Sequence, residues 1–184
     1  MNVSTTTDVP LPQPDLLAAL PRLRRYARVL TGDVHRADDL VQETLARAWE
    51  KRRLWTAGTD LRAWLFTVMH NVFVNQRITA RHEARNVSLD GDGDGGEAWQ
   101  IPVLPAQYAR VELIELIHHV GRLPIEQREV LLLAVVEEMR YEDIARTLAI
   151  PIGTVMSRLS RAREKLRAVF ADVPGTGVPL RVVR

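Results

Sequence analysis

One stretch in the middle of the chain, residues 86–107, divides the sequence into two parts. It reads NVSLDGDGDGGEAWQIPVLPAQ, and its glycines and prolines are incompatible with a continuous helix or strand. Structureless segments of this length are uncommon inside one compact domain, so we interpret it as a linker. We therefore expect one lobe over 15–85 and a second over 108–171, with a disordered tail at 1–14 and another tail at 172–184.

The composition favours helices in both lobes. Aromatic residues make up only 5% of the chain, whereas strands are rich in aromatic and β-branched residues. Glycine and proline cluster in a few places and do not recur every ten residues or so. The predicted fold class is all-α, with two small helical domains joined by a flexible linker. That linker is acidic, because it carries Asp90, Asp92, Asp94 and Glu97 and no lysine or arginine.

Several classes of site are absent from the sequence. There is no cysteine, which excludes disulfides and zinc sites built on thiolates. Asp90, Asp92 and Asp94 resemble the start of a calcium loop, but Ile101 stands where the closing glutamate belongs. There is also no phosphate-binding glycine loop and no nucleophile motif. We predict no catalytic residue, no metal, no cofactor and no small-molecule substrate.

The ends and the hydropathy of the chain predict its compartment. The first residues have neither the basic region nor the apolar core of a signal peptide. No apolar run reaches the roughly 18 residues that a membrane span needs. We expect a soluble, cytoplasmic protein.

The first lobe has the spacing of three helices. Apolar residues recur at helical spacing up to Gly32, and Pro21 inside this run should break or restart the helix. Asp33 and Asp60 stand where they can cap a second and a third helix. The predicted core positions of the second helix are Ala37, Leu40, Val41, Leu45, Ala48 and Trp49, and those of the third are Leu61, Trp64, Leu65, Val68 and Val72.

The second lobe has the spacing of four helices, at about 108–120, from Pro124 to about Glu138, at 141–148 and at about 152–170. The last two have the pattern of a helix-turn-helix, with a tight turn at Ala149–Gly153 in which Pro151 and Gly153 act as breakers. Ile144, Ala145 and Leu148 are the predicted buried side of the first helix, and Val155, Leu159, Ala162, Leu166 and Phe170 that of the second.

The opposite face of the last helix is polar and rich in arginine, which suits the DNA major groove. All but two of the basic residues of the chain, Lys51 and Lys165, are arginines, which bind phosphate and guanine in a bidentate way. Two less specific explanations stay open at this point. A GC-rich genome also favours arginine, and an amphipathic hairpin with a solvated basic face has the same spacing.

Motifs in both lobes resemble those of extracytoplasmic-function (ECF) sigma factors of bacterial RNA polymerase. GTVMSRLSRAREKL, within 141–166, is similar to the fourth conserved region of that family, and LPIEQREVLLL (123–133) looks like the helix before it. ADDLVQETLARAW (37–49) and DLRAWLFTVMHNVFVNQRI (60–78) resemble the second conserved region. The resemblance implies a non-enzymatic subunit that binds core RNA polymerase and directs it to promoters. The −10 element would be read by the first lobe and the −35 element by the helix-turn-helix.

The same resemblance implies three groups of site residues. The polymerase clamp would contact a polar helix face made of Asp38, Asp39, Gln42, Glu43 and Arg47. The −10 element would contact Arg53, Trp55, Asn71, Asn75, Gln76, Arg77 and Arg81, with Trp55 either stacking on a base or anchoring its loop. The −35 element would contact bases through Ser157, Ser160 and Arg161, and phosphates through Arg140, Thr154, Arg158, Arg163 and Lys165. Met156 belongs to the same predicted −35 group, at a position where many members of the family carry a basic residue.

The expected partners are core RNA polymerase, promoter DNA and an anti-sigma factor. Two other functions share part of the pattern: a repressor or activator that acts without the polymerase clamp, and a helical adaptor that binds only proteins. An enzyme is a distant third. Binding to core polymerase separates the sigma factor from the first, and retardation of promoter DNA separates it from the second.

Overall fold

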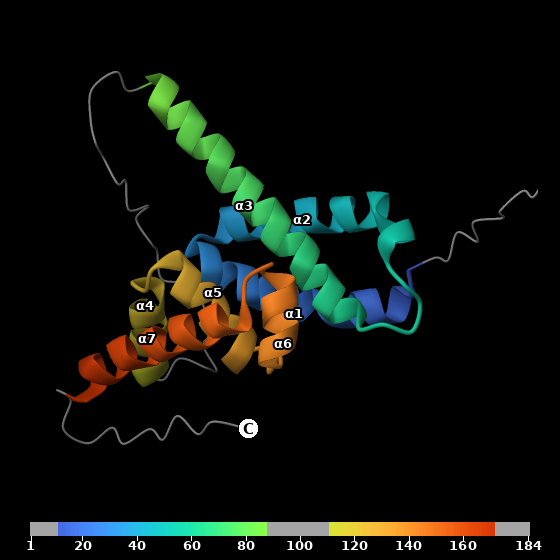
Figure 1. Cartoon of the computed structure of the whole chain (residues 1–184). Coiled ribbons are helices and arrows are strands. Elements are labelled where there is room, and N and C mark those ends of the chain that lie inside the picture. Colours follow the sequence, from blue (N-terminus) through green and yellow to red (C-terminus); the bar gives the residue numbers. More distant parts are fainter. Residues whose placement is uncertain (1–10, 88–110, 172–184) are drawn as a thin grey trace, which may run out of the picture.

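The computed structural model describes residues 11–87 and 111–171, which form seven α-helices, one short 3-10 helix and no strand (Figure 1). The predicted all-α, two-lobed fold is confirmed in these ranges. The linker residues Asp90, Asp92, Asp94 and Glu97, residues 1–10 of the first tail and the whole of the second tail lie outside the described residues. The boundaries of the lobes stay predictions, although the third helix continues to Val87, two residues beyond the predicted end of the first lobe.

The first lobe consists of α1 (Gln13–Thr31), α2 (Val34–Glu50), η1 (Arg52–Leu54) and α3 (Leu61–Val87). The predicted boundaries are confirmed by their caps. Gly32 adopts the left-handed conformation at φ 71°, and its N–H donates to the carbonyl of Arg28 at 2.9 Å. The carboxylate of Asp33 accepts from the backbone N–H of Arg36 at 2.8 Å, and Asp60 accepts from two backbone N–H groups at the start of α3.

Two sequence predictions about the first lobe are wrong. Helix α1 runs through Pro21 without interruption. Proline at this position removes the hydrogen bond to the carbonyl of Leu17, but both residues are exposed, so water can satisfy that carbonyl. The spacing predicts Trp49 in the core, but it is 54% exposed and its ring centroid lies 5.4 Å from the guanidinium carbon of Arg52.

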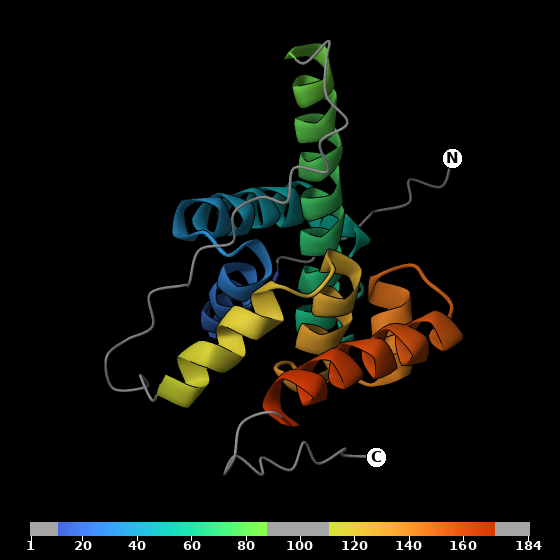
Figure 2. The ribbon, with the colours of Figure 1, turned by 90° about the vertical axis from the view of Figure 1, so that its left-hand side faces the viewer.

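The second lobe consists of α4 (Val111–Gly121), α5 (Ile125–Val135), α6 (Tyr141–Thr147) and α7 (Ile152–Ala171). Helix α5 ends three residues before the predicted Glu138, which instead adopts a left-handed conformation with φ 52° in the turn before α6. The turn sends α6 back across α3, so that the two lobes pack together. Helices α4 and α5 also pack on α1 (Figures 1 and 2).

The core is continuous across both lobes. Leu23, Leu40 and Leu65 are fully buried in the first, and Tyr26 meets Phe66 edge to face with ring centroids 5.0 Å apart. Figure 2 shows the C-terminal part of α3 projecting beyond both lobes as a single helix. None of the helices formed by residues 11–87 and 111–171 is long and apolar enough to cross a bilayer.

Candidate nucleic-acid interface and the contacts between the lobes

The helix-turn-helix is formed by α6 and α7, and its turn differs from the sequence prediction. Ala149, not Gly153, is the residue with the unusual backbone, at φ 52°. The next N–H, of Ile150, donates to the carbonyl of Ala145 at 3.0 Å and closes the turn. Helix α7 starts at Ile152, so Gly153 lies inside its first turn and is not a breaker.

One side of α7 is completely buried. Val155, Leu159, Ala162 and Leu166 are buried as their spacing predicts, and this stripe packs against α5 and α6. The side chain of Phe170, the fifth predicted position, lies outside the described residues. Burying an aliphatic side chain of this size contributes about 1.5–3 kcal/mol. The rotation of α7 about its axis is therefore fixed, and so is the set of residues on its outer face.

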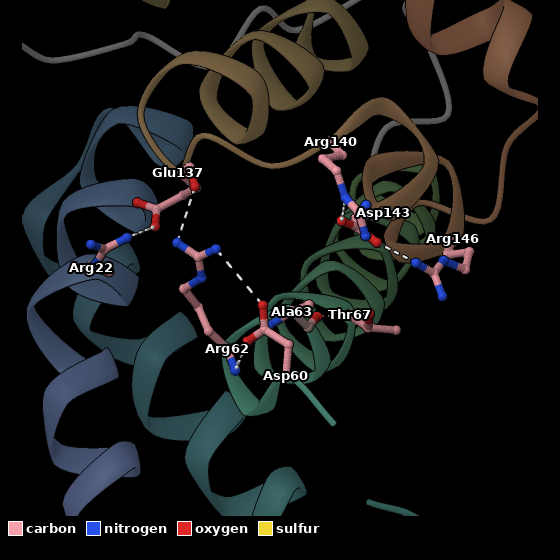
Figure 3. A network of polar contacts seen from close by, with 9 residues as sticks. All are labelled: Arg22, Asp60, Arg62, Ala63, Thr67, Glu137, Arg140, Asp143 and Arg146. Carbon is pink, nitrogen blue, oxygen red and sulfur yellow. Dashed lines mark hydrogen bonds and ion pairs between the residues drawn. The ribbon is translucent and has the colours of Figure 1, made fainter. Parts of the chain in front are cut away.

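The predicted −35 residues do share the outer side of α7. Met156, Ser157, Ser160, Arg161 and Lys165 are exposed, and Thr154, Arg158 and Arg163 are half-buried along its flanks. Arg140 lies apart from them, at the N-terminus of α6. Its guanidinium bonds the carboxylate of Asp143 at 3.2 Å, and Arg146 binds the same carboxylate (Figure 3).

In the first turn of α7, Gly153 places no side chain on the surface. A methyl group placed on its Cα would meet no atom within 4 Å in the part of the chain that the structure describes. Its φ is not in the left-handed region, so neither packing nor backbone conformation requires glycine here. The missing side chain leaves room for a phosphate at this helix N-terminus, where the helix dipole favours an anion.

The predicted −10 residues lie on α3 and on the segment before it. Asn71, Asn75, Gln76 and Arg81 are exposed, and Arg77 is half-buried with its guanidinium carbon 6.0 Å from the ring centroid of Phe73. In the segment before α3, Arg53 of η1 is exposed, whereas Trp55 is partly buried and packs against the core. The anchoring interpretation of Trp55 therefore fits its position better than open stacking.

The predicted clamp residues lie on α2, close to the −10 residues. Asp39 and Gln42 are exposed, whereas Asp38 is half-buried. Arg47 bonds Glu43 at 3.0 Å and Glu50 at 3.2 Å. The hydrogen bond that Arg47 donates to Glu43 is the main cause that raises the pKa of Arg47, with further contributions from both carboxylates. A shallow cleft between α2 and α3 has Glu43 and Arg47 on one wall and Asn75 and Gln76 on the other.

A set of polar residues that the sequence prediction missed joins the two lobes. Glu137, in the turn after α5, is 0% exposed and its carboxylate meets Arg22 at 3.6 Å and Arg25 at 3.4 Å, both on α1. Arg62 of α3 donates to the backbone carbonyl of Glu137 at 3.1 Å (Figure 3). A buried carboxylate in one lobe is thus surrounded by cations from the other.

Arg128 of α5 makes a second connection between the lobes. Its guanidinium donates to the carbonyl of Leu30 at the end of α1, at 2.6 Å, and to the carbonyls of Gly121 and Leu123 in its own lobe. Burial, and to a smaller extent the charge of Arg77, lowers the pKa of Arg128 to about 10. The side chain therefore stays charged at neutral pH.

Two further polar contacts lie between the lobes. His70 Nδ1 of α3 lies 2.8 Å from a carboxylate oxygen of Glu129, and the hydroxyls of Thr67 and Thr147 are 3.5 Å apart. We call Glu137, Arg128, Glu129 and their partners in the first lobe the interlobe cluster. Helical spacing gives no signal for such a cluster, because each charged residue satisfies the pattern of an exposed position.

No group of three or more histidine, aspartate or glutamate side chains within the described residues is arranged to hold a metal ion.

Each lobe matches a known family of sigma-factor domains. Residues 16–70 match the family described as the Sigma2 domain of PhyR, and residues 113–166 match Sigma-70, region 4. The two helical lobes and the helix-turn-helix therefore define a sigma-70-type initiation factor.

Individual relatives agree with this class. The ECF RNA polymerase sigma factor EcfG of Rhodopseudomonas palustris (strain TIE-1) is 42% identical over 156 residues, which cover 85% of this chain and 83% of the relative. SigL of Mycobacterium tuberculosis (strain H37Rv) is 35% identical over 152 residues, covering 82% of this chain and 84% of the relative. The chain belongs to the ECF RNA polymerase sigma factors, which are DNA-binding initiation factors and not enzymes.

A solved structure shares the arrangement of both lobes. The sigma factor RpoE from Bartonella quintana, crystallised with the anti-sigma factor NepR, matches with a TM-score of 0.75 and 35% identity. The match covers 88% of this chain and 97% of that one.

Proposed function

We propose that this sigma factor reads the −35 promoter element with the outer face of α7 and the −10 element with α3 and the loop before it. The observation that carries the proposal is the buried stripe on α7, which presents Ser157, Ser160 and Arg161 together at the surface. Arginine there suits guanine, and the serines suit either kind of base. The half-buried Arg158 and Arg163 are in reach of phosphates.

We further propose that core RNA polymerase docks on the polar face of α2. Asp38, Asp39, Gln42, Glu43 and Arg47 lie on this face, and the cleft between α2 and α3 joins it to Asn75 and Gln76. Docking of the clamp and capture of melted bases would then occur on adjacent surfaces. Each unstacked base held by an aromatic or polar pocket contributes roughly 1–3 kcal/mol to melting.

An anti-sigma factor in the cytoplasm is the third proposed partner. The related RpoE was crystallised with one, and that structure matches both lobes of this chain.

Two promoter elements about two DNA turns apart are separated by roughly 70 Å. In the described structure the two lobes are in direct contact, through α6 on α3 and through α4 and α5 on α1. The lobes must therefore separate before both elements can be read, and a partner that keeps them together would inhibit.

Core-dependent transcription is the direct test. The full chain is added to core RNA polymerase on genomic fragments, and start sites are mapped. We expect transcripts that need both components and begin at a fixed distance from a two-part promoter. DNA binding in the absence of any binding to core polymerase would contradict the proposal and indicate a repressor or activator.

Arg161→Ala is expected to weaken binding to the −35 element by about 1–3 kcal/mol and to relax base preference at one position. The physical reason is the loss of a bidentate contact to a base edge. Footprinting of the holoenzyme on wild-type and singly substituted promoters measures both effects. Arg167→Ala, also exposed on α7 but outside the proposed site, is the matched control. An unchanged footprint for Arg161→Ala would show that this residue does not contact the promoter.

Gly153→Ala is expected to separate stability from DNA binding. Alanine replaces glycine inside a helix where its methyl group meets open space, so thermal stability should stay equal or rise by up to about 1 kcal/mol. Promoter affinity should fall, because the added methyl group occupies the space left for the phosphate. Thermal unfolding and promoter binding by the holoenzyme are measured on the same preparation. Equal promoter affinity in the variant would contradict close approach of DNA to this turn.

A further inference from the structure

The outer side of α7 carries two large apolar side chains that the fold does not bury. Met156 is 50% exposed and Ile152 is 38% exposed, whereas their neighbour Val155 is fully buried. Residues four apart on a helix are adjacent, so Ile152, Met156 and Ser160 form one row along its surface. This row begins at the N-terminal end of α7, the end of a recognition helix that meets base edges.

The residues around this row indicate which kind of partner it binds. Arg163 flanks it on one side, and Ser157 and Arg161 lie across the outer face, so an apolar surface is set among groups that suit DNA. Methionine and isoleucine form no hydrogen bond with a base edge. The only apolar group that base pairs present in the major groove is the C5-methyl group of thymine.

We propose that Met156, together with Ile152, recognises the C5-methyl group of a thymine in the −35 element. The inference rests on the proposed function, since it requires α7 to lie in the major groove. It adds a determinant of base preference that no hydrogen-bonding residue of α7 supplies. Met156 is flexible and unbranched, so it can close around a methyl group without backbone adjustment.

The experiment replaces thymine with uracil, which differs only by this methyl group. Wild-type holoenzyme first selects its −35 element from random duplex DNA. Each thymine on either strand of the selected element is then changed to uracil, one at a time. At one or two positions we expect affinity to fall about fourfold, the effect of losing one buried carbon group. At those positions Met156→Gln should bind thymine and uracil equally, whereas Met156→Leu should still prefer thymine.

Arg161→Ala is the matched comparison. It should weaken binding to the thymine and uracil probes by the same factor and leave their ratio unchanged. A selected element without thymine, equal wild-type affinity for uracil at every position, or a Met156→Gln variant that keeps the full preference would each overturn the inference. Equal affinities combined with weaker binding of Met156→Gln to an anti-sigma factor would assign the row to a protein interface instead.

The two proposals fail in different ways. A holoenzyme that transcribes from its promoter but does not distinguish thymine from uracil contradicts only the role of Met156 and Ile152. A chain that supports no core-dependent transcription contradicts the proposed function itself.

Discussion

Arg128→Met is expected to lower the free energy of unfolding by about 3 kcal/mol or more. The side chain is only 8% exposed, and its guanidinium serves the carbonyls of Leu30, Gly121 and Leu123. Methionine has a similar length but no donor, so these carbonyls lose their charged partner. Each buried acceptor left unsatisfied costs about 1–3 kcal/mol, which outweighs the gain from removing a buried charge.

Urea denaturation measures this change, and hydrogen exchange locates it. Because the Leu30 carbonyl belongs to the first lobe, protection should fall at the end of α1 as well as in α4 and α5. Arg122→Met changes an exposed arginine nearby and serves as the control, with an expected effect within about 0.5 kcal/mol. Equal unfolding midpoints for the two variants would show that the carbonyls find other donors.

The double change Arg22→Ala and Arg25→Ala is expected to separate the two lobes. Both arginines are about half exposed, so neither contact alone adds much stability. Removing both takes away the two arginines that pair with the fully buried carboxylate of Glu137 and leaves, among the described residues, only Arg62, which bonds its backbone carbonyl. Breaking a buried ion pair in this way costs about 3–5 kcal/mol. Opening of the interface relieves this cost by returning the carboxylate to water.

Fluorescence energy transfer between the lobes measures the opening. The chain has no cysteine, so cysteines introduced at Ala46 and Ala168, both exposed, are the only labelling sites. Transfer should fall in the double variant and recover when Glu137→Gln removes the negative charge as well. Arg24→Ala, an exposed neighbour on α1, should leave transfer unchanged. Equal transfer in the double variant and in wild type would show that Glu137 does not hold the lobes together.

Sequence reasoning predicted the elements that depend on local physical chemistry. The caps at Gly32, Asp33 and Asp60 and the buried stripe of α7 follow from spacing and from the hydrogen-bonding capacity of single residues. Errors arose where tertiary context decides. Trp49 fits the apolar periodicity of α2, but its position lies at the edge of the core and Arg52 covers its ring.

The contacts between the lobes cannot be predicted from the local sequence, for a related reason. Glu137 is followed by a second glutamate, and nothing in the local sequence distinguishes the buried one from the exposed one. Burial of Glu137 depends on arginines more than a hundred positions earlier in the chain. The turn begins at Ala149 as predicted, but Gly153 is not one of its breakers, because an alanine adopts the left-handed backbone and α7 already starts at Ile152.

The chemical character of the interlobe cluster has a consequence for solubility. Surfaces that separate during a working cycle become aggregation-prone when they are apolar. Here the groups released by separation include guanidinium, carboxylate and imidazole side chains, all of which water solvates well. Separation also exposes part of the apolar core that both lobes share. We therefore expect these charged groups to offset part of the aggregation tendency of the separated lobes. This effect comes at the expense of a tighter closed state, which an apolar interface of equal area would provide.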